Sequence, residues 1–281
     1  MPASSLSDVL EEIKSLEPLP EVALRVLQLA REEDVIPREL VAVIQTDAAI
    51  TAKVLKLCNS AYFGFRREIA SLHEAGNLLG VSTLVNLVLT SCAGRYFRDY
   101  GHSGNHGVKS RWEESVSNAL AASMIAGLAG VDKPRAYTAG LLMNVGHLVM
   151  DRFVPEKIED LRAAVRAGAT RIEAEQDVIG MNHAEIGGRL AQRWAFPEVM
   201  VDTIRTHHDP RSAGLDPKLA SCAHLGEMFT QALDLGEGLE RTAYALQGSA
   251  LHICGIDRSG FDRIEGQLRA EIRKARDLIE V

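Results

Sequence analysis

Apolar residues recur at helical spacing along most of the chain. In the segment VALRVLQLA, residues 22–30, the side chains of Val22, Val26 and Leu29 fall on one face, which is the three- and four-residue spacing of an amphipathic helix. Residues 48–58 show the same spacing. No segment sustains the alternation of apolar and polar residues that is typical of a half-buried strand. The pattern therefore predicts an all-α fold.

Residues that cap or begin helices stand at the starts of these segments. Asp47 is a good N-cap for the segment that follows it. Ser71 with Glu74, and Thr170 with Glu173, have the spacing of a capping box. Proline is favoured in the first turn of a helix, and five prolines stand where helices are expected to begin: Pro20, Pro37, Pro134, Pro155 and Pro197.

One glycine-rich stretch interrupts the helical pattern. Residues 99–110, DYGHSGNHGVKS, hold three glycines and no apolar periodicity, which is typical of a loop or linker. We expect this stretch to separate an N-terminal helical lobe, residues 1–98, from a C-terminal helical lobe, residues 111–281. In the last part of that lobe, an amphipathic face is expected to pack on the core rather than on a partner; its residues are Leu268, Ile272, Ala275 and Ile279.

The composition is that of a globular chain with a sizeable core. Apolar residues make up 46% of the sequence and charged residues 25%, with a net charge of −7. Such a balance lacks the basic footprint that binding along a nucleic-acid backbone requires, so nucleic acid is not an expected partner.

The location is predicted to be cytoplasmic, without a membrane partner. The first residues show no basic stretch followed by an apolar one, so no signal peptide is expected. The longest apolar segments, around 119–131 and 136–150, are interrupted by polar residues and fall short of the roughly 18 uninterrupted apolar residues of a membrane span. Four widely spaced cysteines form no CxxC pair and are expected to be buried, reduced thiols: Cys58, Cys92, Cys222 and Cys254.

Candidate chemistry centres on an amide and three histidines. Asn144 stands inside the apolar run GLLMNVGHL, residues 140–148. His183 begins one predicted helix, while His207 and His208 close the next. Neutral imidazoles can ligate a metal, whereas a charged histidine at the C-terminus of a helix is favoured by the helix dipole alone. Neighbouring residues of a helix point about 100° apart, so both adjacent histidines need not face one ion.

Two segments of the N-terminal part carry a family resemblance. DAAITAKVLKLCNSAYFG, residues 47–64, and IASLHEAGNLLG, residues 69–80, resemble the HDOD domain, the HD-related output domain of bacterial signalling proteins. The sequence departs slightly from the usual pattern, with Ala48 where proline is common and Gly76 where a larger apolar residue is common. The matching motif residues are Asp47, Lys53, Asn59, Ser60, Tyr62 and Phe63.

The C-terminal part fits the same resemblance, which covers roughly residues 12–230. AYTAGLLMNVGHLVM, residues 136–150, is similar to the helix that carries the His-Asp pair of HD phosphohydrolases. Residues 182–210 are similar to the two helices that follow it. The resemblance implies an N-terminal helical lobe joined to an HD-like helical bundle.

The departures from the HD pattern concern its metal ligands. In HD enzymes an early His, the His-Asp pair and a late Asp hold divalent metals that activate water. Here the resemblance places Glu114 at the early His, Met143 and Asn144 at the pair, and His224 at the late Asp. Methionine is a weak ligand, and a neutral amide is a poor substitute for a bridging carboxylate. The resemblance therefore implies a non-catalytic domain with no expected metal or other cofactor.

Two interpretations of the retained histidines stay open. In the first, His183 and either His207 or His208 form a buried hydrogen-bonded network around Asn144, whose amide can donate and accept. In the second, Glu114, His224 and these histidines form a remodelled metal site. His183, His207 and His208 are the candidate ligands if a divalent metal binds.

The functional hypothesis is a non-catalytic regulatory module of signal transduction. It acts through signalling protein partners, a second copy of itself, or a sensed small ligand. One alternative is a metal-dependent phosphohydrolase with altered ligands. Another is a pseudoenzyme that binds a nucleotide in the vestigial site without cutting it. The chain contains no phosphate-cradling GxxxxGK[ST] or GxGxxG motif, which disfavours the last alternative.

Overall fold

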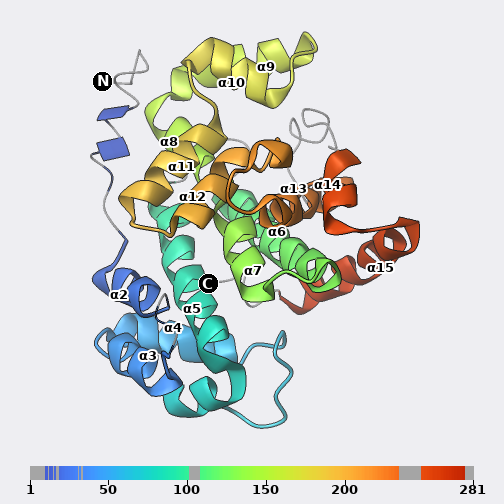
Figure 1. The fold of residues 1–281 in the computed structure, drawn as a ribbon. Coiled ribbons are helices and arrows are strands. Elements are labelled where there is room, and N and C mark those ends of the chain that lie inside the picture. Colours follow the sequence, from blue (N-terminus) through green and yellow to red (C-terminus); the bar gives the residue numbers. More distant parts are fainter. Residues whose placement is uncertain are drawn as a thin grey trace.

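Helices account for the regular structure of the protein (Figure 1). The computed structural model describes residues 10–100, 108–233 and 248–275, apart from residues 12, 15, 17, 18, 31 and 33. These described residues contain no strand. The predicted all-α fold is therefore confirmed.

In the N-terminal part of the chain, the described residues define the bounds of four helices. Asp47 begins the third of them as predicted, because its Oδ1 accepts from the backbone N–H groups of Ala49 and Ile50 at 2.9 and 3.0 Å. The fourth helix is broken at Gly80, whose φ of 78° and ψ of 171° are not helical and suit a residue without a Cβ. The helices are α2 (Glu21–Leu29), α3 (Pro37–Ile44), α4 (Ala48–Cys58) and α5 (Leu72–Tyr100).

The C-terminal part is a bundle built around α6, α7 and α13, which pack against one another. The predicted capping box at Thr170 and Glu173 begins α10. The elements are α6 (Val108–Ala129), α7 (Lys133–Leu142), α8 (Gly146–Phe153), α9 (Ile158–Arg166), α10 (Arg171–Ile179), α11 (His183–Arg193), α12 (Glu198–Thr206), α13 (Pro217–Ala232), α14 (Gly248–Cys254) and α15 (Arg258–Lys274), with the short 3₁₀ helices η1 (Pro155–Lys157) and η2 (Pro210–Ser212).

Two glycines allow the central helices to approach each other closely. A Cβ added at Gly140 of α7 would lie 2.6 Å from the backbone oxygen of Asn118 on α6, and one added at Gly226 of α13 would lie 2.8 Å from the backbone nitrogen of Ala122. Neither contact is compatible with a side chain. The short helix separations that these glycines permit bring α7 and α13 together over α6, where the site described below is built.

Helix α5 is shared by both parts of the fold. It packs against α3 and α4 and also against α7 and α8, and it runs between these groups of helices in Figure 1. Its stretch Leu72–Phe97 is long and apolar enough to cross a membrane, with a mean hydropathy of 1.4, but 61% of the most apolar window is buried inside the protein. This stretch is therefore a core helix. It is longer than the apolar segments that the sequence pattern drew attention to, around 119–131 and 136–150.

The C-terminal helix packs as predicted. Leu268 and Ile272 of α15 and its C-cap Ala275 are at most 8% exposed, and α15 lies against α6. Ile279, the last member of the predicted face, lies outside the described residues. The four cysteines are buried free thiols, which confirms that prediction also.

The predicted linker falls mostly outside the described residues. Helix α5 ends at Tyr100 and α6 begins at Val108, so residues 101–107 of the predicted linker 99–110 are not described. The division of the chain into two lobes stays a prediction.

Candidate functional site

Four histidines and two glutamates meet in the interior of the C-terminal bundle. They come from five helices or helix ends, and the tertiary structure closes them off from solvent almost completely. Five of them are at most 2% exposed, and the side chain of His208 is 13% exposed. We call these residues the histidine cluster: His147 at the start of α8, Glu175 on α10, His183 at the start of α11, His207 and His208 just after α12, and Glu227 on α13.

Glu175 is the anchor of the histidine cluster. Its Oε2 accepts from the backbone N–H of His183 at 2.8 Å and lies 2.7 Å from Nδ1 of the same residue. Its Oε1 accepts from Arg171 Nε at 2.6 Å and lies 3.3 Å from His147 Nε2. Burial by itself raises the pKa of Glu175, but the imidazoles of His183 and His147 outweigh burial and hold that pKa well below its usual range. Glu175 is therefore a charged carboxylate that fixes the rings around it.

The orientation of the His183 ring follows from this contact. A charged carboxylate only accepts hydrogen bonds, so Nδ1 of His183 carries the proton that faces Glu175. The other ring nitrogen, Nε2, lies 2.9 Å from Nε2 of His208. Two imidazole nitrogens at this distance either share one proton or direct both lone pairs at a common cation.

His207 and His208 are held as neutral rings. Nδ1 of His207 donates to the backbone oxygen of Ile204 at 2.7 Å, so its Nε2 carries the lone pair and faces Glu227 Oε2 at 4.0 Å. Nδ1 of His208 lies 3.8 Å from the same oxygen. Burial, followed by the imidazole of His183, lowers the pKa of His207 well below its usual value. Burial and the ring of His207 do the same to the pKa of His208.

Asn144 reaches the cluster from the end of α7. Its Nδ2 donates to Oε1 of Glu227 at 2.8 Å. The amide nitrogen must face this carboxylate, because a carboxylate oxygen has no hydrogen to give. The first interpretation of the retained histidines placed Asn144 in a hydrogen-bonded network with them, but the hydrogen bond of its Nδ2 goes to Glu227 instead, and its Oδ1 is buried without a hydrogen-bond partner among the described residues. The carboxylate of Glu227 on α13 lies between Asn144 and the histidines and takes the amide N–H. Met143, the preceding residue, is completely buried.

Gly146 explains the second unusual position in GLLMNVGHL. A Cβ at this residue would collide with the backbone carbonyl of His183 and approach the backbone nitrogen of Gly187 to 3.0 Å. The absence of a side chain lets the start of α8 lie directly on the start of α11. This contact brings the rings of His147 and His183 to a centroid separation of 3.9 Å.

Comparison with known proteins identifies the family. The HDOD domain matches residues 16–210. The chain belongs to the HDOD family. An uncharacterised protein of Treponema pallidum (strain Nichols) is 32% identical over 244 residues, which are 83% of this chain. The chain spans only 45% of the length of that curated relative.

Solved structures have the same fold. An HDOD domain protein of unknown function from Geobacter sulfurreducens is 25% identical, with a TM-score of 0.76 over 98% of this chain and 95% of that one. A protein of Shewanella amazonensis, provisionally described as a phosphohydrolase, is also 25% identical, with a TM-score of 0.76 and coverage of 96% and 97%. A provisionally described signal transduction protein of Marinobacter aquaeolei is 23% identical and shows the fold alone, with a TM-score of 0.76 over 96% of this chain and 60% of that one.

The HDOD motif residues of the N-terminal part shape its backbone. The side chain of Asn59 closes the loop between α4 and α5: its Nδ2 donates to the backbone oxygens of Leu55 and Ile69 at 3.0 and 2.9 Å, and its Oδ1 accepts from Ile69 N at 2.7 Å. Ser60 is buried and Lys53 half-buried on the same segment. The N-cap Asp47 thus fixes the start of α4, and Asn59 fixes the loop after it.

Glu114 and His224 lie inside the bundle but differ in their relation to the cluster. Glu114 is 4% exposed on α6 and belongs to neither group of candidate metal ligands described below. His224 is 1% exposed on α13, one turn before Glu227. Burial lowers the pKa of His224 to about 4, against the opposing effect of its hydrogen bond to the backbone of His207.

Sequence reasoning missed three members of the cluster: His147, Glu175 and Glu227. His147 and Glu227 each lie on a helix that proves to be mostly buried, whereas Glu175 lies on α10, which is largely polar and partly exposed. For His147 and Glu227 the available signal was an ionisable residue among apolar ones, because such residues are rarely buried without a partner. That signal marks a residue as notable, but it does not say which residues meet.

The residues of the cluster fit a divalent metal. Two groups have ligand atoms within 4.8 Å of one another: His183 with His207 and His208, and His183 with His147 and Glu175. Metal-bound histidines usually donate their other ring N–H to a carboxylate or a backbone carbonyl. Glu175 takes this place behind His183, and the carbonyl of Ile204 takes it behind His207. Neutral imidazoles with such support can hold a metal such as zinc, iron or nickel.

Proposed function

We propose that this HDOD chain is a non-catalytic regulatory module of signal transduction. It acts through a signalling protein partner, through a second copy of itself, or through a small ligand that it senses. The observation that carries the proposal is the hydrogen bond from Asn144 to Glu227. The amide that stands in place of the acidic member of the HD pair is uncharged, and its N–H is directed at a carboxylate. It therefore supplies no oxygen anion to bridge two metals.

The burial of the cluster supports the same proposal. Hydrolysis of a phosphoester requires the phosphorus to meet a metal-bound water, so at least one coordination position must face the substrate. His147, His183 and His207 are at most 2% exposed, and only the side chain of His208 reaches 13%. Such a closed arrangement is better suited to holding the bundle together than to admitting a phosphodiester.

A second candidate function is a metal-dependent phosphohydrolase with altered ligands. The fit of His183, His207 and His208 to one cation favours it, as does the provisional description of the Shewanella amazonensis protein as a phosphohydrolase. A bound divalent metal would supply an activated water. Glu175 would then orient His183, and the Ile204 carbonyl would orient His207.

A metal and activity measurement separates the two functions. The chain is purified without chelators, its metal content is measured by elemental analysis, and hydrolysis of bis-p-nitrophenyl phosphate and a cyclic dinucleotide is followed with added Mg²⁺, Mn²⁺, Fe²⁺ or Zn²⁺. We expect no hydrolysis above background in the wild type. Hydrolysis that disappears in His183→Ala but persists in His73→Ala, an exposed control, would establish the second function instead.

Restoration of the HD pair gives a stricter version of this test. We expect the double variant Met143→His, Asn144→Asp to stay inactive, because Glu114 and His224 still replace the two other acidic or histidine ligands of the HD pattern. Phosphodiesterase activity in this variant would mean that the remaining residues form a competent metal site, and that a single pair of substitutions separates the regulatory chain from an enzyme.

A further inference from the structure

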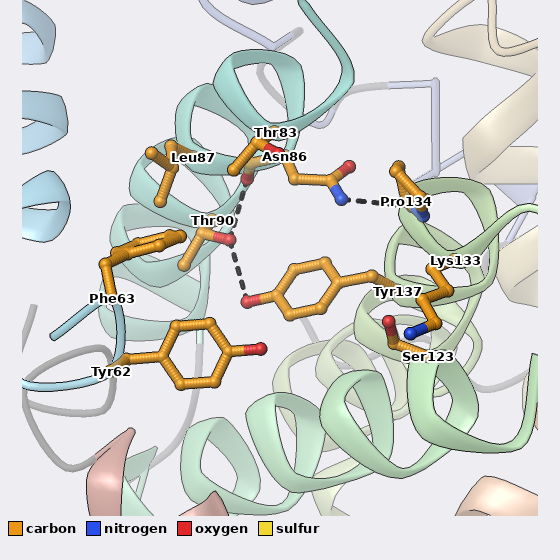
Figure 2. A pocket seen from close by; sticks show the side chains of 10 residues that line it. All are labelled: Tyr62, Phe63, Thr83, Asn86, Leu87, Thr90, Ser123, Lys133, Pro134 and Tyr137. Carbon is orange, nitrogen blue, oxygen red and sulfur yellow. Dashed lines mark hydrogen bonds between the residues drawn. The ribbon is translucent and has the colours of Figure 1, made fainter. Parts of the chain in front are cut away.

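A separate cavity lies at the opposite end of α7 from the histidine cluster. It has a volume of about 320 Å³ and is lined from four directions: the loop after α4, α5, α6 and the start of α7 (Figure 2). It contains no residue of the cluster. Cavities that bind small molecules in proteins have volumes of about 300–1,000 Å³ and combine apolar walls with a few polar groups. This one has the size for a molecule of one or two rings.

Aromatic side chains form one wall of the cavity. Tyr62 and Phe63 meet edge to face, with ring centroids 5.1 Å apart, and Tyr137 enters from α7 (Figure 2). The loop that carries Tyr62 and Phe63 is closed by the three hydrogen bonds of Asn59. The rings are therefore held in place before any ligand arrives, which lowers the entropic cost of binding. Aromatic walls of this kind favour a flat ring in offset or edge-on contact.

A chain of hydrogen bonds fixes the direction of the Tyr137 hydroxyl. Oγ1 of Thr90 donates to the backbone oxygen of Asn86 at 2.8 Å, so its single proton is used. The hydroxyl of Tyr137, 3.2 Å from Oγ1 of Thr90, must then be the donor in that contact. Burial raises the pKa of Tyr137, so the phenol keeps its proton. Its oxygen still has lone pairs that can accept a hydrogen bond from a group in the cavity.

Lys133 brings a positive charge to the mouth of the cavity. Its methylene stem lies over Gly127 of α6, where an added Cβ would run into it. Within the part of the chain that the structure describes, no carboxylate lies within ion-pair distance of its ammonium group. A neighbouring hollow of about 490 Å³ shares Tyr62, Ser123 and Lys133 with the cavity. Lys133 thus stands where the two hollows meet, and an anionic group there would gain a charge-assisted hydrogen bond.

We propose that this cavity binds a small flat aromatic molecule that carries one anionic group. The ring lies against Tyr62, Phe63 and Tyr137, the anionic group pairs with Lys133, and a donor on the ring reaches the oxygen of Tyr137. A single anionic group fits best, because Glu271 lines the neighbouring hollow and opposes further negative charge. The proposal deepens the regulatory function by giving the sensed ligand a site, and it rests on that function only for its biological role.

The experiment titrates the full chain with two anionic probes, 4-aminobenzoate and adenosine monophosphate, and with the uncharged 4-aminobenzamide. Ligand-observed NMR detects weak binding, and calorimetry gives the Kd where binding is tight enough. We expect at least one anionic probe to bind with a Kd near or below about 1 mM, and the amide to bind more weakly than the benzoate. The preferred probe tells whether the anion is a carboxylate or a phosphate.

Matched variants locate the binding. Lys133→Met should weaken the binding of the anionic probe about tenfold or more, because a charge-assisted hydrogen bond is lost. Lys133→Arg should restore much of the affinity. Tyr62→Ala should weaken the binding of all ring-containing probes. Lys157→Met is the control, since it makes the same change of charge on η1, where Lys157 lines neither hollow. Both lysines lie at least partly exposed, so the melting temperature of each variant should match that of the wild type.

Two outcomes would overturn the proposal: no saturable binding of either anionic probe up to about 10 mM, or binding that Lys133→Met and Tyr62→Ala leave unchanged. Neither outcome depends on phosphodiester hydrolysis. A chain that hydrolyses a phosphodiester but binds the probes at Lys133 would refute the regulatory function and keep the ligand site. An inactive chain that does not bind the probes would keep the regulatory function and refute the ligand site.

Discussion

The two ends of α7 carry polar groups in opposite situations. The helix has ten residues and is about 15 Å long. Just past its C-terminal end, Asn144 joins a cluster of polar groups that are nearly closed to solvent and of which several bond one another. At its N-terminal end, Lys133 and Tyr137 line an open cavity. The end that is richer in metal-ligand residue types is the closed one, and no such residue lines the hollow of ligand size at the other end.

This contrast shows what residue types alone leave undecided. A histidine or a carboxylate can serve a ligand or stabilise a core, and the difference lies in what its polar atoms already bond. Glu175 uses both oxygens on Arg171, His147 and His183, so its charge is used inside the protein. Tyr137 bonds Thr90 through its proton and retains the acceptor side of its oxygen. Only the second kind of group has capacity left for a molecule from outside.

The largest expected effect tests whether the closed end is held together by the charge of Glu175. Glu175→Gln should lower the free energy of unfolding by about 3–5 kcal/mol, because it removes the buried negative charge that Arg171 Nε, His183 and His147 face. Urea denaturation of the metal-free protein measures the change. Asp177→Asn makes the same change of charge on the exposed side of α10 and should cost no more than about 0.5 kcal/mol. Equal effects in the two variants would show that Glu175 does not anchor the cluster.

A smaller effect concerns acid stability of the same end. The pKa of His224 is lowered to about 4 in the folded protein, whereas an unfolded histidine titrates near pH 6.5. Between these values the unfolded chain binds a proton that the folded chain excludes, so stability falls as the pH drops from about 6.5 towards 4. His207 and His208, whose pKa values are also lowered, act in the same direction. The part due to His224 should amount to about 2–3 kcal/mol.

The measurement is the urea midpoint between pH 7.5 and pH 4.5 with a chelator present. His224→Gln should flatten the dependence, while His73→Gln, at an exposed position on α5, should leave it unchanged. An identical slope in all three proteins would mean that the pKa of His224 is not lowered in the folded state. Glu175 contributes to the pH dependence of stability only at lower pH, because its pKa in the folded protein lies below its usual value.

The smallest expected effect on stability tests the open end. Asn59→Ala removes the three hydrogen bonds that close the loop of Tyr62 and Phe63 and should cost about 1–2 kcal/mol. Asn59→Ala should also clearly weaken binding of the aromatic probe at the proposed ligand site. Asn182→Ala removes the N-cap of α11 at a similar cost but should leave probe binding intact. Unchanged probe binding in Asn59→Ala would show that the loop is not what prepares the cavity.

Much of the local structure could be predicted from the sequence. The N-cap at Asp47, the capping box at Thr170, the start of α11 at His183 and the end of α12 before His207 all follow from residues within a few positions of one another. The all-α fold and the unusual character of Asn144 were predicted on the same basis. These features depend on backbone hydrogen bonds and helical spacing, which act over one or two turns.

The composition of the site was decided only by the tertiary structure. Glu227 meets Asn144 across 83 positions of sequence, and Glu175 meets His147 across 28; no local pattern encodes such a pairing. The same holds for the cavity, because Thr90 and Tyr137 become neighbours only when α7 packs on α5. The sequence by itself determined which helices form and which of their residues are polar. Helix packing, set by glycines such as Gly140 and Gly146 where backbones nearly touch, determined which of those polar residues meet and which face open space.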